Sequence, residues 1–484
     1  MEAKKQEDYS LTIPLLLHNG DVGTKAKEEQ CTEQCTNRRT GTTSFMSTCF
    51  NGLNALSVQS GFYPKTEKTL AMKPRTGPVI ANYGLGLCPT FFGLVQLVVL
   101  SDVHPYLYLC RVGILSVPYA LASGGWLSLT LLLVIAISTL YTGLLIQRCM
   151  DSDPTITTYP EIGDRAFGKT GKTLVSITMN IELYLVATGF LILEGDNLSK
   201  LFPDIDFDIY GIHIGSKSGF IVMVAIIILP TSWLNNMTIL SYISAGGVLA
   251  MVIILVSIFW GGAFDGIGFQ EKGNFVKWNG VPSAINLYTF CYCAHPVFPT
   301  LYASMKNQRQ FSKVLFLCFA FCTFTYSFMA IIGYLMFGSK VESEITLNLP
   351  TDNLSSRVAI FTTLVTPIAK YALMVTPIVN TIEARFQSSY NKRIRLFIIK
   401  TILMITSVIV ALSLPFFGDL MSLVGALLSA TVSITIPCLC YLKISGIYRR
   451  IGVEMVIVVF VGLIGVFVAL VGTYVSVLDI ERNL

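Results

Sequence analysis

The chain has 484 residues, of which 53% are hydrophobic and 13% are charged, and its mean hydropathy is +0.64. A soluble domain of this length and composition would be hard to keep in solution, so we expect an all-α protein that crosses a membrane many times. The formal net charge of +5 is small and the basic residues cluster in loops. This pattern favours a lipid bilayer over a nucleic acid as the partner.

The twelve cysteines do not follow the spacing of a secreted disulfide framework or of a metal site. Most of them lie within apolar segments, which predicts buried packing. The sequence contains no P-loop that would power transport by nucleotide hydrolysis, and no convincing nucleophile and base pair. We therefore expect no enzyme activity, no catalytic residue, no metal and no cofactor.

The first 111 residues are unlike the rest of the chain. Residues 1–43 are polar and lack the apolar core of a signal peptide, so we expect a disordered cytosolic tail. The stretch 44–57, SFMSTCFNGLNALS, is apolar but shorter than the roughly 20 residues that a span needs. Residues 58–111 bring charges and prolines, and they separate this stretch from the next apolar segment.

That segment, VGILSVPYAL from Val112 to Leu121, joins a glycine and a proline five residues apart within an apolar run. Gly113 permits an unwound backbone, and Pro118 removes a backbone donor. In hydrocarbon an interrupted helix survives only where it is buried in protein or lines a cavity. The segment therefore predicts a broken helix at a binding site, and a tolerated kink is the alternative.

Ten apolar spans follow the broken segment. The loops after the first, fifth, seventh and ninth of them carry about twice as many Lys and Arg as the opposite loops, so the positive-inside rule makes them cytosolic. This orientation places the N-terminus in the cytosol and the C-terminus in a lumen. The expected spans are 126–147, 174–196, 219–234, 238–260, 283–303, 313–336, 358–381, 396–414, 416–441 and 453–478.

When the broken segment is counted as the first span, a second break lies in the sixth span, where CYCAHPVFPTLY (291–302) holds His295, Pro296 and Pro299. Breaks in spans one and six are the signature of an inverted five-helix repeat with substrate held between half-helices. A half-helix N-terminus suits a carboxylate, and unwound carbonyls suit an ammonium or a cation.

Three ionisable residues lie inside spans, where charge is expensive and indicates function. Glu182, Lys370 and His295 are therefore candidates for handling a coupling ion. The alternatives are a structural pair of Glu182 with Lys370 and a helix-capping role for His295. Glu194 and Asp196 are expected nearer the lumenal end, where they are solvated.

With these residues in view, the chain resembles the amino acid/auxin permease family, in particular its plant vacuolar amino-acid transporters. The resemblance implies a LeuT-like fold of about eleven helices with helices 1 and 6 broken, and a transporter domain at 112–480. It also implies secondary active transport of amino acids, coupled to protons, across the tonoplast. The matching motifs are CFNGLNALS, VGILSVPYALASGGW, YTGLLIQRCMDSDP, TYPEIGDRAFGKTG, ELYLVATGFLILEGDNL, FCYCAHPVFPTLYASMKN, KYALMVTPIVN and SLVGALLSATVSITIPCLCYLKI.

Carried over residue by residue, the resemblance implies a substrate site on the two breaks. The residues are Val112, Gly113, Ile114, Leu115 and Ser116 of helix one with Ala294 and His295 of helix six. The rival function is an amino-acid sensor that binds without transporting. Among three sequons, Asn353 in the loop 337–357 is the glycosylation candidate, because it combines lumenal placement with distance from a span end.

The chain departs from the family at 58–111. In the family ALS continues directly into GVGILS as one helix, whereas here 54 residues separate Ser57 from Val112, and Arg111 replaces the first glycine. A retained intron is one explanation, since the codon of Val58 begins with GT and Cys110 with Arg111 can be written TGCAG. A lineage-specific loop is the other. We expect the insert to disable the protein as written, or to displace its first helix.

Overall fold

The computed structural model describes residues 113–483 apart from 210–211, 234–236, 306, 384, 386–391, 415 and 450–451. The predicted tail (1–43), the first half of helix one (44–57), the insert (58–111) and Val112 lie outside the described residues. Expectations for these parts of the chain stay predictions.

The described residues contain eight helical segments that are long and apolar enough to cross a membrane. The other predicted spans correspond to helix α7 and to the short helices α3, α8 and α9. Helix α3 is the described half of segment one, and α8 with α9 forms the broken segment six. The bounds are α3 (Val117–Gly124), α4 (Ser128–Ser152), α5 (Tyr159–Leu201), α6 (Ser216–Trp233), α7 (Met237–Ala263), α8 (Val281–Cys291), α9 (Phe298–Ser304), α10 (Phe311–Phe337), α11 (Leu354–Glu383), α12 (Lys392–Ser413), α13 (Phe417–Leu423), α14 (Ile436–Ser445) and α15 (Val453–Asn483).

The helices are apolar on nearly all sides because one face meets protein and the other meets lipid. Helix α15 illustrates this, since Phe460, Phe467 and Leu470 are each more than 60% exposed while Val458 is fully buried. Large apolar side chains that are exposed over a whole span belong in hydrocarbon. The chain is therefore a multi-pass membrane protein.

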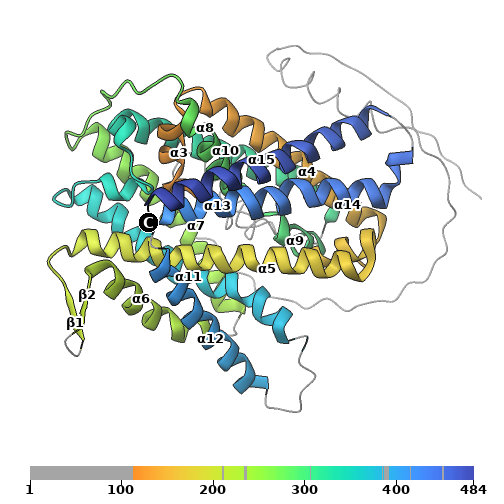
Figure 1. The fold of residues 1–484 in the computed structure, drawn as a ribbon, viewed down its shortest axis with the longest axis horizontal. Coiled ribbons are helices and arrows are strands. Elements are labelled where there is room, and N and C mark those ends of the chain that lie inside the picture. Colours follow the sequence, from red (N-terminus) through yellow and green to blue (C-terminus); the bar gives the residue numbers. More distant parts are fainter. Residues whose placement is uncertain are drawn as a thin grey trace, which may run out of the picture. The chain divides into compact units, whose positions relative to one another are not determined.

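The helices form two packed groups. Each group contains two helices from segments one to five and two from segments six to ten. Segments one and two pack with segments six and seven, as α3 and α4 with α8 and α10. Segments three and four pack with segments eight and nine, as α5 and α6 with α11 and α12. In Figure 1 the second group occupies the lower part of the described ribbon, and α3, α4, α8 and α10 lie above it. Equivalent segments of the two halves thus take equivalent places, as the predicted five-helix repeat requires.

The connection between α5 and α6 contains a short β-hairpin, which the sequence did not suggest. Strands β1 (Phe207–Ile209) and β2 (Ile212–Ile214) pair antiparallel, with Phe207 opposite Ile214. The hairpin belongs to a loop, so the helical fold class is confirmed.

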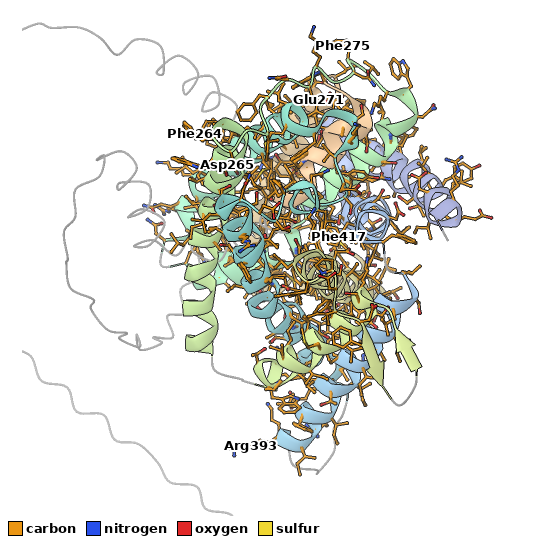
Figure 2. All side chains as sticks on the ribbon, turned by 90° about the vertical axis from the view of Figure 1, so that its left-hand side faces the viewer. Phe264, Asp265, Glu271, Phe275, Arg393 and Phe417 are labelled. Atoms are coloured by element: carbon orange, nitrogen blue, oxygen red, sulfur yellow. The ribbon has the colours of Figure 1, made fainter. Side chains whose placement is uncertain are left out.

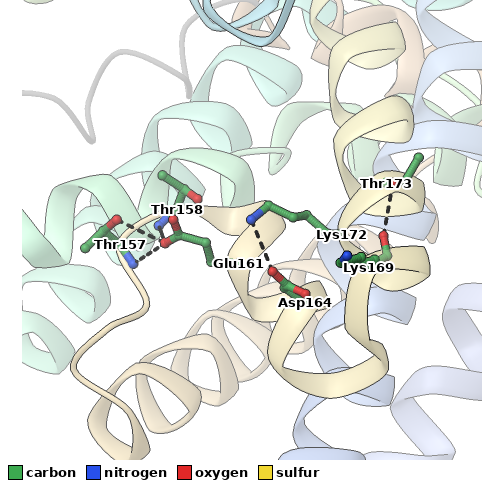
Figure 3. Close-up of polar contacts among 7 residues, drawn as sticks. All are labelled: Thr157, Thr158, Glu161, Asp164, Lys169, Lys172 and Thr173. Carbon is green, nitrogen blue, oxygen red and sulfur yellow. Dashed lines mark hydrogen bonds and ion pairs between the residues drawn. The ribbon is translucent and has the colours of Figure 1, made fainter. Parts of the chain in front are cut away.

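Helix α5 begins with a capped turn that precedes its long apolar span. The Glu161 carboxylate accepts hydrogen bonds from the backbone N–H of Thr157 at 2.7 Å and of Thr158 at 2.9 Å. Gly168 then takes a positive φ of 68°, a conformation that side chains with a Cβ disfavour, and the chain turns into the long span. The Lys172 ammonium lies 3.1 Å from the Asp164 carboxylate across this turn (Figure 3).

Loops that the positive-inside rule assigns to one side of the membrane also contact one another in the structure. On the predicted cytosolic side, Arg148 lies 2.6 Å from Glu454 and the Tyr302 hydroxyl donates to Asp151. On the predicted lumenal side, the backbone N–H of Trp126 donates to the Asn274 carbonyl at 3.1 Å. In Figure 2, Phe264 and Asp265 of the loop before α8 lie at the upper left, Glu271 and Phe275 of the same loop lie toward the top, and Phe417 lies amid the helices.

Candidate substrate and coupling site

The two helix breaks meet at the carbonyl of Gly113. Residues Gly113–Leu115 form a single 3₁₀ turn, and the Ser116 backbone N–H and hydroxyl each donate to the Gly113 carbonyl at 3.2 Å. The Cys291 thiol donates to the same carbonyl at 3.6 Å. A Cβ on Gly113 would lie 2.8 Å from the Cys291 Cβ, closer than real Cβ atoms approach. Only glycine therefore allows this contact.

The break in segment six lies where the sequence predicts it. Helix α8 ends at Cys291, a 3₁₀ turn covers His295–Val297, and α9 begins at Phe298. The C-terminus of α8, the negative end of its dipole, thus lies near the N-terminus of α3, the positive end of its dipole. The described candidate residues Ile114, Leu115, Ser116, Ala294 and His295 are all buried.

Glu182 reaches this region from the middle of α5, and its side chain is buried. The Ser429 hydroxyl donates to Glu182 Oε1 at 2.7 Å, and Cys293 lines the same small cavity as Glu182. Glu182 Oε2 is buried without a partner among the described residues. Ser429 ends a π-helical turn, Val424–Ser429, and such turns are frequent at functional sites. The carboxyl group therefore joins segments three, six and ten.

A cavity of about 20 Å³ lies beside Glu182. A space of this size accommodates about one water molecule, so an amino acid does not fit. Among the described residues, substrate binding beside Glu182 therefore requires movement of the residues that line this cavity. These are Glu182, Leu183, Val186, Phe290, Cys293, Pro296 and Met374.

His295 points away from this lining and holds segment six against α4. Its Nε2 lies 3.0 Å from the Thr142 hydroxyl and 3.0 Å from the Thr139 carbonyl. The Thr142 hydroxyl also donates to the Ser433 carbonyl at 2.7 Å, which brings α4, the break and segment ten together. His295 Nδ1 is buried and has no partner in the described part of the chain. These contacts link segment six to the interior of α4 and do not cap a helix end. The capping and coupling roles of His295 both stay predictions.

Lys370 lies deep in α11, with Nζ 5.8 Å from the centroid of the Phe190 ring. Cations at this distance over an aromatic face are stabilised by the ring. The Glu182 carboxylate accepts a hydrogen bond from Ser429, and a structural pair of Glu182 with Lys370 stays a prediction.

Sequence reasoning missed Lys400, which is buried within the predicted ninth span. Its ammonium donates to the Ser232 carbonyl at 2.7 Å, at the C-terminal end of α6. A lysine suits a helix C-terminus, where carbonyls lack partners. The signal that selected Lys370, an ionisable residue inside an apolar run, was present at Lys400 as well.

The expectation that Glu194 and Asp196 are solvated was wrong. Glu194 is 1% exposed, and Asp196 pairs with Lys217 of α6. The physical reason is that the connection between α10 and α11 folds over this end of α5, where Asn197 donates to Glu344 at 2.7 Å.

A model of a known protein family matches most of the chain. The family described as transmembrane amino acid transporter protein matches residues 109–478. The chain belongs to this family. Amino acid transporter AVT1J of Arabidopsis thaliana is 59% identical over 374 residues, which cover 77% of this chain and 88% of the relative. Amino acid transporter AVT1I of the same plant is 57% identical over 365 residues, covering 74% of this chain and 90% of the relative.

Two solved structures overlap with most of the chain at low sequence identity. The structure of MhsT in complex with L-phenylalanine covers 76% of this chain and 98% of its own, with a TM-score of 0.48 and 12% identity. The inward-facing conformation of Mhp1 covers 79% of this chain and 90% of its own, with a TM-score of 0.47 and 10% identity.

Proposed function

We propose that the chain is a secondary active transporter of amino acids, coupled to protons and located in the vacuolar membrane. Membership of the transmembrane amino acid transporter family and the names of the two Arabidopsis relatives support the substrate class. The observation that carries the mechanism is the meeting of two helix breaks at Gly113 and Cys291. Each break lies in the first segment of one five-segment half.

The breaks suit a zwitterion because they present opposite partial charges to one point. The N-terminus of α3 offers N–H groups to a carboxylate, and the C-terminus of α8 offers carbonyls to an ammonium. Since the cavity beside Glu182 holds about one water molecule, the transport cycle must separate the breaks to admit a substrate. Gly113, Ile114, Leu115, Ser116 and Ala294 are the described residues at this point.

Glu182 is the leading group for binding the coupling proton. One carboxyl oxygen accepts from Ser429, and the other faces no donor within the described residues. A carboxyl group in a site of this kind can bind a proton without leaving a buried charge. A change in the protonation state of Glu182 alters its contacts with Ser429 and Cys293, and through them affects segments ten and six. His295 and Lys370 stay second candidates for the coupling role.

The orientation that we propose has the N-terminus in the cytosol and the C-terminus in the lumen. The excess of basic residues in the loops joining α4 to α5 and α11 to α12 supports it. The same-side contacts of Arg148 with Glu454 and of Trp126 with Asn274 agree with this grouping of loops.

The test is uptake of labelled amino acids into vesicles with an imposed pH gradient. We expect Glu182→Gln to reduce gradient-driven accumulation to the level of equilibration while exchange of labelled for unlabelled substrate continues, because the amide keeps a hydrogen-bonding side chain but cannot carry a proton. The control is Glu481→Gln at the exposed end of α15. Saturable binding without accumulation in the wild type would favour the sensor, and unchanged coupling in Glu182→Gln would remove this residue from the mechanism.

A further inference from the structure

A second group of buried polar residues lies at the predicted lumenal end, away from the helix breaks. Glu194 and Asn197 are one turn apart on α5, and Glu344 belongs to loop 338–353 between α10 and α11. The Asn197 amide donates to Glu344 Oε2 at 2.7 Å, and the Glu194 and Glu344 carboxyl groups are close enough to interact electrostatically. All three side chains are at most 1% exposed.

This group has too few donors for its acceptors. Within the described residues, Glu194 Oε1, Glu344 Oε1 and Asn197 Oδ1 are buried without a hydrogen-bond partner. The two N–H donors of the Asn197 amide are already used, because one serves Glu344 and the other the Leu193 carbonyl at 2.8 Å. Buried acceptors without donors are costly, and two carboxylates in one dry site repel each other. The missing partner is a hydrogen atom on one carboxyl group.

A metal ion fits this group less well than a proton. Among the described residues, no three His, Cys, Asp or Glu side chains are placed to hold a metal. The nearest further charges are already engaged, since Asp196 pairs with Lys217 of α6 and the Lys200 ammonium donates to the Leu347 carbonyl. Glu342, on the same loop, is exposed. Among the described residues, Lys217 is the cation that acts on Glu344, and its charge is shared with Asp196, to which it is paired.

The residue after Glu344 connects this pair to the broken helix. Ile345 is fully buried, and a Cβ on Gly333 of α10 would lie 2.5 Å from Ile345 Cδ1 and 2.6 Å from the Pro118 ring of α3. Loop 338–353 also contacts α13, because a Cβ on Gly418 would lie 2.8 Å from the Ser343 Cβ. The loop thus lies against the first turn of α3, directly after the break.

We propose that Glu194 and Glu344 share one proton taken from the lumen, and that this proton holds loop 338–353 closed over α3. Loss of the proton leaves two carboxylates in a buried site, so the loop detaches and Ile345 leaves its place beside Pro118. The lumenal designation rests on the proposed orientation. The site is separate from Glu182 and controls access to the centre of the transporter.

The experiment measures loop closure directly, without substrate or gradient, so its result does not depend on whether the protein transports. Full-length protein in nanodiscs carries Ile345→Cys, and its rate of modification by a membrane-impermeant maleimide is measured from pH 5.5 to 8. The rate is divided by that of Ser339→Cys, an exposed position on the same loop, which cancels the intrinsic pH dependence of the thiol reaction. Leu349→Cys, also fully buried, serves as a second reporter in case Ile345→Cys opens the loop by itself.

In the wild-type background we expect the ratio to rise by up to about tenfold per pH unit, because opening releases one proton. Glu344→Gln and Glu194→Gln each remove the repulsion, so each should keep the ratio low and independent of pH. The matched control Glu342→Gln should retain the wild-type profile. A wild-type ratio that does not change with pH at either reporter, or an unchanged slope in both Gln variants, would overturn the proposal.

Discussion

Gly113 lies against Cys291 so closely that a Cβ on the glycine would lie 2.8 Å from the cysteine Cβ and 2.9 Å from its Cα. The two helix breaks are therefore held together by backbone proximity and by the thiol that donates to the Gly113 carbonyl. Any side chain at residue 113 must push the breaks apart.

We expect Gly113→Ala to reduce amino-acid uptake at least tenfold and to destabilise the protein by about 1–3 kcal/mol, the usual cost of overpacking. Transport assays and a thermal melt at matched expression measure the two effects. Gly452→Ala is the control, because a Cβ there meets nothing within 4 Å. Wild-type uptake in Gly113→Ala would show that the breaks separate without loss of function.

His295→Gln tests whether this histidine handles protons or only secures the break. Glutamine retains an N–H that can reach the Thr139 carbonyl, but it does not titrate near neutral pH. If His295 contributes to coupling, as the sequence predicts, the variant should lose the pH dependence of transport and accumulate less substrate. Normal pH dependence and accumulation in an insert-free background would assign the proton to Glu182 or to no side chain.

Residues 58–111 are expected to abolish transport in the chain as written. Asn51 and Asn54 must lie in fixed register with Gly113 and Ser116, because a charge-binding break requires the half-helix ends to converge. The family match begins at residue 109, beside the C-terminal edge of the insert. A version that joins Ser57 through one glycine to Val112 should accumulate amino acids where the full chain does not. Equal accumulation at matched expression would identify the insert as an accommodated loop.

Asn353 reports the orientation in the membrane. It immediately precedes α11 and is partly exposed, whereas the sequon residue Asn197 is buried and bonded to Glu344. A cysteine at residue 353 should react with an impermeant thiol reagent only from the lumenal side, and one at the exposed Lys169 only from the cytosolic side. The opposite result would reverse the topology.

The stability of the folded protein should fall as pH rises, through Glu344. Burial raises the pKa of this carboxyl well above its ordinary value of 4.5, and the charge of Asp196 raises it further. The folded state thus binds a proton that the unfolded state has released, so stability decreases with pH from about 4.5 up to the raised pKa. Melting temperatures from pH 5 to 8 should decline less in Glu344→Gln. Parallel curves would show that Glu344 does not titrate in this range.

The sequence predicted the spans well because each is a long apolar run whose limits depend on local composition. The expected 126–147 and 313–336 correspond to α4 and α10, and both breaks lie at their glycine and proline positions. Breaks are local too, since a missing donor acts on its own turn.

Partners across the chain could not be predicted in the same way. Ser429 meets Glu182 across 247 residues, and Glu344 meets Asn197 across 147. Single-sequence periodicity carries no information about such pairs. The π-helical turns at Val424–Ser429 were also hidden, because they arise where segment ten packs so tightly that a Cβ on Gly425 would meet the backbone of Asn286.

The small size of the cavity beside Glu182 also bears on the ion and solute gradients across the surrounding membrane. A pathway with an open middle would let ions and solutes run down their gradients through every copy of the protein. Within the described residues, Cys293 and Pro296 pack beside Glu182 around a space for about one water molecule, which is too small for a solute to pass. A membrane can thus contain many copies that are not transporting and still keep its voltage and its solute gradients. These gradients are spent only when a copy completes a transport cycle.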